Sequence, residues 1–222
     1  MTRERELIET RWQLALCSPL HFGRWFCRTL DSQNVDHPIQ AFPMHKPHLQ
    51  ALTRLWLANP WLFVEKSRQM LVTWWAAMLS AWLVLARPGS MIFQQSKKLQ
   101  DVVGNEVTGD GLLGRTKFIL RAIPYQEWLM PARWQDGILS DSITLPWRNS
   151  AIQAIAEGGS QLRSHTASML VTDETAVQPE FAEAYTASVA SLRRSRWLAI
   201  TTPNLADGGQ SMRIARDQAD SK

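Results

Sequence analysis

The sequence predicts an α/β fold in which helices flank a mostly parallel β-sheet, giving three layers. Short apolar stretches of strand length alternate with longer stretches of helical periodicity, which is typical of parallel sheets with right-handed crossovers. The chain has 222 residues, of which 45% are hydrophobic and 20% charged, as expected for a globular protein with a full core. Two apolar stretches also lead into short polar segments, which places candidate ligand-binding groups at the ends of strands.

The first part of the chain, residues 1–45, is predicted to form a helical arm. Residues 3–16 have a helical repeat. The apolar residues that share one face of this helix are Ile8, Trp12, Ala15 and Leu16. From Ser18 to Pro47 the sequence is rich in His, Pro, Asp and Asn, which predicts a loop with a short helix near residues 23–30.

Residues 46–205 carry the alternation expected of the sheet domain. The predicted helices are 48–58, a helix that ends before Arg87, 97–107, 113–123 and 180–191. The predicted strands are 61–65, 90–94, 143–145, 151–155, 168–172 and 197–201, with the third and fourth paired as a hairpin. Residues 206–222 are polar and are expected to form a linker or a frayed end, with no nuclease domain in this chain.

One segment has the apolar character of a membrane span. Met70 to Ala86 is a run of seventeen residues without a charge. This length is at the short end of what crosses a bilayer, and the run begins inside a candidate ligand-binding loop. A buried helix is therefore favoured over a transmembrane helix, and no membrane partner is expected.

The segment KSRQMLVT (66–73) follows the strand 61–65 and is the first candidate binding motif. The common phosphate loop is G-x-x-x-x-G-K-[ST], in which glycines let backbone N–H groups surround the phosphates. This chain has Lys66, Leu71 and Val72 at the two Gly positions and the Lys position, and it keeps only the hydroxyl, Thr73. Lys66 and Arg68 can supply the charge from the start of the loop, and the helix N-terminus supplies N–H donors. An ordinary strand–helix turn with two basic residues is the alternative.

The segment MLVTDETA (169–176) is the second candidate motif. Its apolar half predicts a central strand, and Asp173 and Glu174 follow at the carboxyl end of that strand. An aspartate at this position can hold Mg²⁺, and an adjacent glutamate can deprotonate an attacking water. An acidic turn that favours a helix N-terminus is the alternative.

Together with TTPN (201–204), these two segments resemble the ATPase domain of phage terminase large subunits, the motors that package viral DNA into procapsids. The resemblance implies a P-loop NTPase of the RecA-like (ASCE) class, with ATP and Mg²⁺ as cofactors. It implies Glu174 as catalytic base, Lys66 and Arg68 as catalytic cations, and Thr73 and Asp173 as the metal site. The implied ATP-binding loop comprises Lys66, Ser67, Arg68, Gln69, Met70, Leu71, Val72 and Thr73. The implied coupling motif comprises Thr201, Thr202, Pro203 and Asn204.

The same resemblance implies partners and a location. Double-stranded DNA, a portal and a small terminase subunit are the expected partners, and the active form is expected to be a ring of identical subunits. The expected location is the cytoplasm of a bacterial host, on a procapsid during packaging. Two alternatives remain open: a degenerate or truncated terminase piece that binds nucleotide or partners without turnover, which Leu71 and Val72 favour, and a helicase-like nucleic-acid-dependent ATPase.

Arginines are concentrated near the end of the chain. Residues 191–216 contain five Arg and one Asp, a local excess of +4 that equals the net charge of the whole chain. Arg193, Arg194 and Arg196 are candidates for trans-acting arginines, and a solvated or DNA-facing role is the alternative. A loop with Gly158, Gly159 and Arg163 is expected to be a plain surface loop, with contact to nucleotide or a neighbouring subunit as the alternative.

Overall fold

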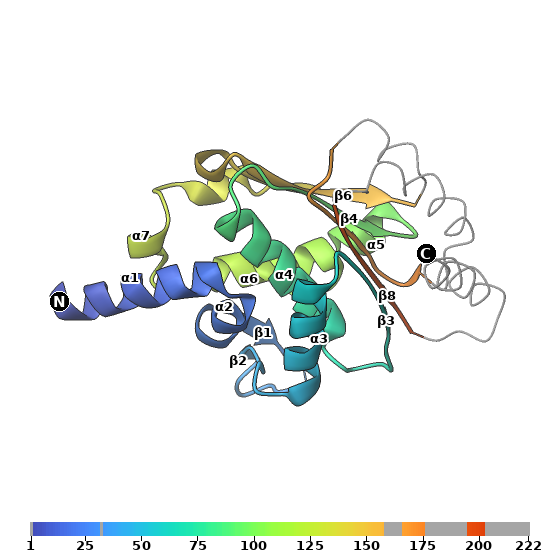
Figure 1. Cartoon of the computed structure of the whole chain (residues 1–222), viewed down its shortest axis with the longest axis horizontal. Coiled ribbons are helices and arrows are strands. Elements are labelled where there is room, and N and C mark those ends of the chain that lie inside the picture. Colours follow the sequence, from blue (N-terminus) through green and yellow to red (C-terminus); the bar gives the residue numbers. More distant parts are fainter. Residues whose placement is uncertain (1, 32, 158–165, 176–194, 203–222) are drawn as a thin grey trace.

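The structure is a computed structural model that describes residues 2–31, 33–157, 166–175 and 195–202. Its centre is a sheet of six strands in the order β3-β8-β7-β4-β6-β5, flanked by helices (Figure 1). The strands are β3 (Trp61–Glu65), β4 (Met91–Ser96), β5 (Ser142–Leu145), β6 (Ser150–Ala156), β7 (Met169–Thr172) and β8 (Arg196–Thr201). Only β5, at one edge, is antiparallel to its neighbour among these described strands. The predicted fold class is confirmed.

The sheet order places the two candidate motifs on the same side of the sheet, at the carboxyl ends of its parallel strands. β3 leads into the loop 66–71, and β7 leads into Asp173. β8 lies between these two strands and is parallel to both. Because parallel strands end on the same side of a sheet, the segments after β3, β7 and β8 lie together at the carboxyl ends of these strands.

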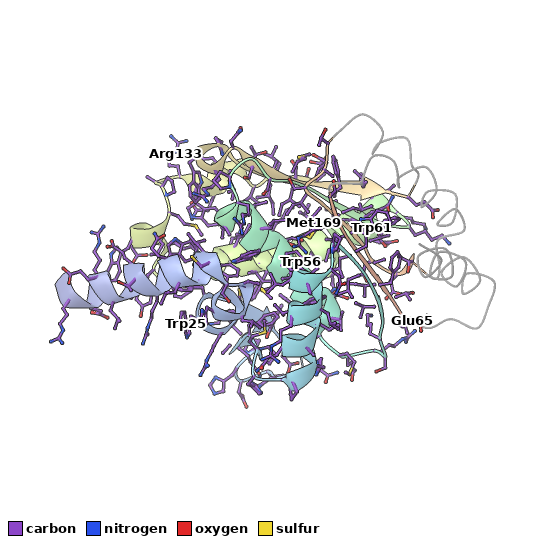
Figure 2. The ribbon with its side chains drawn as sticks, viewed as in Figure 1. Trp25, Trp56, Trp61, Glu65, Arg133 and Met169 are labelled. Carbon is purple, nitrogen blue, oxygen red and sulfur yellow. The ribbon has the colours of Figure 1, made fainter. Side chains whose placement is uncertain are left out.

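The long apolar helix α4 (Val72–Ala86) fills the middle of the main core. Every residue from Val72 to Leu85 is buried. Trp56 on α3 (Pro47–Ala58) and Met169 on β7 lie in the same core (Figure 2). In the part of the chain that the structure describes, no helix has both the length and the apolar character that a bilayer crossing requires. The segment predicted as a buried helix is therefore a core helix.

The N-terminal segment packs directly onto α4. It contains α1 (Thr2–Cys17), α2 (Pro19–Phe26) and a two-stranded sheet of β1 (Arg28–Leu30) and β2 (Ile39–Ala41). Trp12 packs edge-on against Phe26, and the indole N–H of Trp82 on α4 donates a hydrogen bond to the carbonyl of Ala15 (3.0 Å). The helix predicted near residues 23–30 is misplaced, because Pro19 starts the helix earlier and residues 28–30 pair with β2.

The remaining helices include one clear departure from prediction. The bounds are α5 (Leu99–Val103), α6 (Leu112–Arg121), α7 (Gln126–Leu129), and the 3₁₀ turns η1 (Trp134–Gly137) and η2 (Pro146–Arg148). The helix predicted over 97–107 ends at Val103 because Gly104 has a φ of 53°, and a Cβ there would lie 2.0 Å from the carbonyl oxygen of Asp110. The hairpin of β5 and β6 is confirmed, and the helix predicted over 180–191 lies outside the described residues.

Candidate active site

Three sequence motifs converge on the ammonium group of Lys66. Its Nζ lies 3.5 Å from Oε1 of Glu174 and donates a hydrogen bond to the hydroxyl of Thr202 (3.3 Å). The backbone N–H of Lys66 continues the β3–β8 ladder by donating to the carbonyl of Thr201 (2.9 Å). The Lys66 side chain is only 12% exposed. The cation is therefore held between Glu174 and Thr202, although 108 and 136 residues separate it from them in sequence.

The loop between β3 and α4 carries the backbone strain that glycine would avoid. Gln69 and Leu71 have φ values of 62° and 59°, in the left-handed region. This conformation costs a non-glycine residue about 1–2 kcal/mol. The Leu71 side chain packs against the main core, and burial of its apolar surface offsets part of that cost. The ring nitrogen Nε2 of His48 lies 3.2 Å from the carbonyl oxygen of Met70 and fixes the loop from α3.

The first turn of α4, directly after this loop, has backbone hydrogen-bond donors without partners in the helix. The helix begins after Leu71, and no side chain caps it. The first backbone N–H groups of a helix have no partner within the helix and lie at the positive end of its dipole. Val72, Thr73 and Trp74 supply these groups, and all three residues line a cavity. The arrangement favours an anion at this position.

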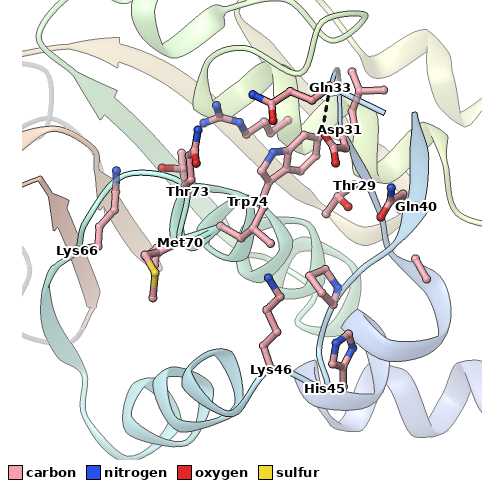
Figure 3. A pocket seen from close by; sticks show the side chains of 17 residues that line it. Thr29, Asp31, Gln33, Gln40, His45, Lys46, Lys66, Met70, Thr73 and Trp74 are labelled. Atoms are coloured by element: carbon pink, nitrogen blue, oxygen red, sulfur yellow. Dashed lines mark hydrogen bonds between the residues drawn. The ribbon is translucent and has the colours of Figure 1, made fainter. Parts of the chain in front are cut away.

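The cavity has a volume of about 660 Å³ and lies between the loop, the start of α4 and the β1–β2 segment (Figure 3). Lys66 and Thr73 lie on one side of it, and Lys46, from the segment before α3, lies on another. Thr29 and Gln40 of the small sheet complete the far side. A cavity of this volume matches a small-molecule ligand, and its cations match an acidic one.

The acidic motif has unusual electrostatics. Burial raises the pKa of Asp173, and the neighbouring Glu174 carboxylate raises it further. Lys66, Arg115 and a hydrogen bond from the backbone N–H of Glu174 (3.0 Å) lower the pKa again but do not cancel the increase. The Asp173 carboxyl group therefore favours its neutral form more than an exposed aspartate does, unless a further cation is bound beside it.

This shift predicts a pH dependence of stability. Because the folded-state pKa of Asp173 lies above its ordinary value of 3.8, the folded protein binds more protons than the unfolded chain between these two pKa values. The contribution of Asp173 to stability is therefore present below pH 3.8 and is lost as the pH rises through the folded-state pKa. Urea unfolding of Asp173→Asn should lack this component of the pH profile. Asp101→Asn, which changes an exposed aspartate, should retain it; identical profiles for both variants would contradict the assignment.

The predicted metal ligands are compatible with Mg²⁺. Thr73 lies in the first turn of α4, and Asp173 follows β7. Among the described residues, no group of three or more His, Cys, Asp and Glu side chains is close enough to hold a metal by itself. Mg²⁺ typically binds one or two carboxylates together with substrate phosphates and water, so it does not require such a group.

Some predicted residues do not line the cavity. Ser67 and Arg68 are exposed and do not line it, whereas Lys66 and Gln69 to Thr73 do. The other predicted residues in the described part of the chain that do not line it are Asp173, Glu174, Thr201 and Thr202. Pro203 and Asn204 lie outside the described residues, as do Gly158, Gly159, Arg163, Arg193 and Arg194. The roles proposed for these residues stay predictions.

The position of Arg196 corrects the prediction that this residue is a trans-acting or solvated arginine. It begins β8, whereas the candidate site lies at the other end of that strand. Its guanidinium group lies over the ring of Trp56, 4.3 Å from the ring centroid, and donates hydrogen bonds to the carbonyls of Trp56 and Asn59. Arg196 therefore ties β8 to α3, and neither a trans-acting nor a freely solvated role fits these contacts.

Sequence reasoning missed two contributors to the site. Arg115 on α6 lines the cavity and acts electrostatically on Asp173, and Lys46 lines the cavity from the segment before α3. Neither belongs to a recognisable local motif. The positive net charge gave a general signal for an acidic ligand, but it did not identify these positions.

Comparison with solved structures shows that this fold is similar to a known one. No protein-family model and no curated protein matches the chain. The structure is similar to the crystal structure of the HK97 bacteriophage large terminase, with a TM-score of 0.60 and 16% identity over 93% of this chain and 41% of that chain. This chain thus spans about two fifths of the HK97 protein.

The large-terminase ATPase domain of Thermus phage P74-26 aligns with 18% identity over 72% of this chain and 66% of that chain, at a TM-score of 0.47. A mutant of that domain aligns with 18% identity over 73% and 68% of the two chains, at a TM-score of 0.48. The HK97 similarity confirms, at the level of fold, the resemblance to the terminase large subunit.

Proposed function

We propose that this chain is the ATPase module of a viral DNA-packaging motor of the large-terminase class. It hydrolyses Mg-ATP and uses the energy to translocate double-stranded DNA into a procapsid. The observation that carries the proposal is the position of Lys66 Nζ, 3.5 Å from Glu174 and 3.3 Å from Thr202, next to the open N-terminus of α4. The fold shared with the HK97 large terminase supports the same conclusion.

The proposed reaction is in-line attack of water on the terminal phosphate of ATP. Lys66 and the first N–H groups of α4 bind the phosphates, and Glu174 accepts the proton of the attacking water. Thr73 and Asp173 would hold Mg²⁺, which would neutralise charge on the phosphates. Thr202, hydrogen-bonded to Lys66, connects the phosphate site to the segment that follows β8.

The proposed assembly and partners are those expected of a large-terminase motor. In this proposal the chain acts as a ring of identical subunits on a portal, with a small terminase subunit and duplex DNA as further partners. It works in the cytoplasm of a bacterial host while the procapsid fills. Nuclease activity is not assigned to the residues of this chain.

A second candidate function keeps nucleotide binding but lacks turnover. The left-handed Leu71, in a position that glycine takes in the common loop, is the observation that favours it. A side chain at this position restricts how closely the backbone can approach a phosphate.

Two measurements on the wild-type protein test the proposal. Phosphate release from ATP, with and without duplex DNA and with and without Mg²⁺, should show magnesium-dependent turnover that DNA stimulates. Nucleotide titration by calorimetry should show saturable binding. Binding without phosphate release would establish the second candidate, and absence of both binding and release would refute the nucleotide site itself.

A further inference from the structure

Arg115 is a partly buried cation to which the proposed mechanism assigns no role. It lies on α6, which packs against α4, and it lines the same cavity as Lys66 and Thr73. The electrostatic interaction between Arg115 and Asp173 acts on the pKa values of both groups. The guanidinium group is therefore close enough to Asp173 for the two charges to interact.

The surroundings of Arg115 hold it in place. Its Cζ lies 5.7 Å from the centroid of the Trp74 ring, within the range of a cation–π contact. Trp74 is itself fixed by an edge-on contact with Phe118, with ring centroids 5.5 Å apart. Gly109 lies so close to the Trp74 ring that a Cβ there would be 2.9 Å from it. A cation held this firmly needs little ordering when a ligand binds.

The hydrogen-bonding capacity of Arg115 is not used up. Its Nε is buried, and it has no hydrogen-bond partner among the described residues. Burial lowers the pKa of the guanidinium group, while Asp173 and Asp110 raise it, and an arginine side chain remains protonated in proteins. Buried donors are nearly always satisfied, so this unpartnered N–H leaves Arg115, a residue that lines the cavity, with hydrogen-bonding capacity that a ligand can fill.

We propose that Arg115 contacts the terminal phosphate of the bound nucleoside triphosphate from within the same chain and sets the preference for triphosphate over diphosphate. The inference rests on the proposed function. The planar guanidinium fork matches the oxygens of a phosphate group. In the proposed reaction the terminal phosphate lies next to Asp173 and Glu174, and Arg115 is the cation of α6 that interacts electrostatically with Asp173.

The experiment compares Arg115→Gln with Arg121→Gln in the full chain. Both substitutions remove one positive charge from α6, but Arg121 lies outside the cavity and pairs with Glu106 (3.0 Å). Calorimetric titrations give the Kd for Mg-ATP and Mg-ADP. Arg115→Gln should weaken ATP binding about 10- to 100-fold, the range for a hydrogen bond to a charged group, and ADP binding by less than about 3-fold. Arg121→Gln should change neither Kd by more than about 2-fold.

Several results would overturn the inference. An unchanged Kd for ATP in Arg115→Gln would do so, and so would equal losses for ATP and ADP, because a purely structural role weakens both nucleotides alike. If Arg115→Gln does not fold, Arg115→Lys keeps the charge but lacks the fork, and an ATP-to-ADP preference equal to that of the wild type would overturn the inference.

The same titrations separate the inference from the proposed function. Wild-type protein that binds neither nucleotide refutes both. If Lys66→Ala abolishes binding of ATP and ADP while Arg115→Gln keeps the wild-type preference, the proposed site stands and only the role of Arg115 is refuted.

Discussion

Replacing Glu174 with Gln is expected to lower the rate of ATP hydrolysis about 10²- to 10⁴-fold while leaving nucleotide affinity nearly unchanged. A general base contributes a factor of this size, and the amide cannot accept the proton of the attacking water. Gln keeps the shape of the side chain, so the loop around Lys66 should be preserved. Steady-state phosphate release gives kcat, and calorimetry gives the Kd.

Lys66→Ala should weaken nucleotide binding as well as lower the rate of hydrolysis. Lys66 is mostly buried and contacts both Glu174 and Thr202, so its loss removes phosphate-binding charge and leaves a carboxylate without its ion pair. We expect a Kd for ATP raised about 10-fold or more, together with a lower rate. The contrast between the two variants separates the base from the phosphate-binding cation.

The matched control for this pair is Glu65→Gln, which removes a carboxylate from the exposed end of β3. It should change kcat and Kd by less than about 2-fold. Wild-type turnover in Glu174→Gln would exclude this residue as the base. Arg68→Ala belongs in the same series, because the resemblance predicts a catalytic role for a side chain that the structure leaves exposed.

The sequence predicts those site residues that lie at the ends of parallel strands. Lys66, Asp173 and Thr201 each stand at the carboxyl end of an apolar run, and an α/β pattern implies that these runs are parallel. Residues that are distant in sequence must then meet at one edge, as the contacts of Lys66 with Glu174 and Thr202 confirm. Neither the exact contact nor the burial of Lys66 was predictable, because both depend on the loop conformation.

What sequence could not predict depends on packing between helices. Arg115 reaches the cavity because α6 packs on α4, and no local pattern encodes that arrangement. Arg196, by contrast, has the sequence context of a free basic residue but lies against the ring of Trp56. One arginine is thus directed to the site and the other away from it by tertiary contacts alone.

Leu71 shows a third limit of prediction from the sequence. The phosphate-loop pattern marks its position as one for glycine, and the structure gives it a φ of 59°. The pattern therefore identified the conformation correctly but not the residue that adopts it. Contact of the leucine side chain with the core provides a stabilisation that glycine would lack, so the same backbone is reached by a different balance of strain and burial.

Trp75→Ala is expected to cause the largest loss of stability among the changes considered. Trp75 lies on α4, is fully buried, and donates a hydrogen bond from its indole N–H to the hydroxyl of Thr53 on α3 (2.9 Å). That hydroxyl in turn donates to the carbonyl of Leu49 (2.7 Å). Removing a buried tryptophan should lower the free energy of unfolding by about 3–5 kcal/mol, through lost burial and the cavity that remains.

Two further variants separate packing from hydrogen bonding. Trp75→Phe retains most of the buried ring but not the N–H donor, so it should cost roughly 1 kcal/mol for the lost hydrogen bond plus a small packing loss. Trp147→Ala removes a tryptophan that is 38% exposed and should change stability by about 0.5 kcal/mol or less. Urea unfolding measures all three, and a loss in Trp75→Ala no larger than in Trp147→Ala would contradict the role of α4 as the centre of the core.

The same substitution links the core to the site. Thr73 lies two residues before Trp75 in the first turn of α4, and the hydrogen bond to Thr53 holds that turn against α3, whose His48 contacts the loop at Met70. Trp75→Ala should therefore weaken nucleotide binding even under conditions in which the protein remains folded, whereas Trp75→Phe should bind nearly as the wild type does. Equal affinity in the folded Ala variant would mean that the loop is held by the sheet and His48 alone.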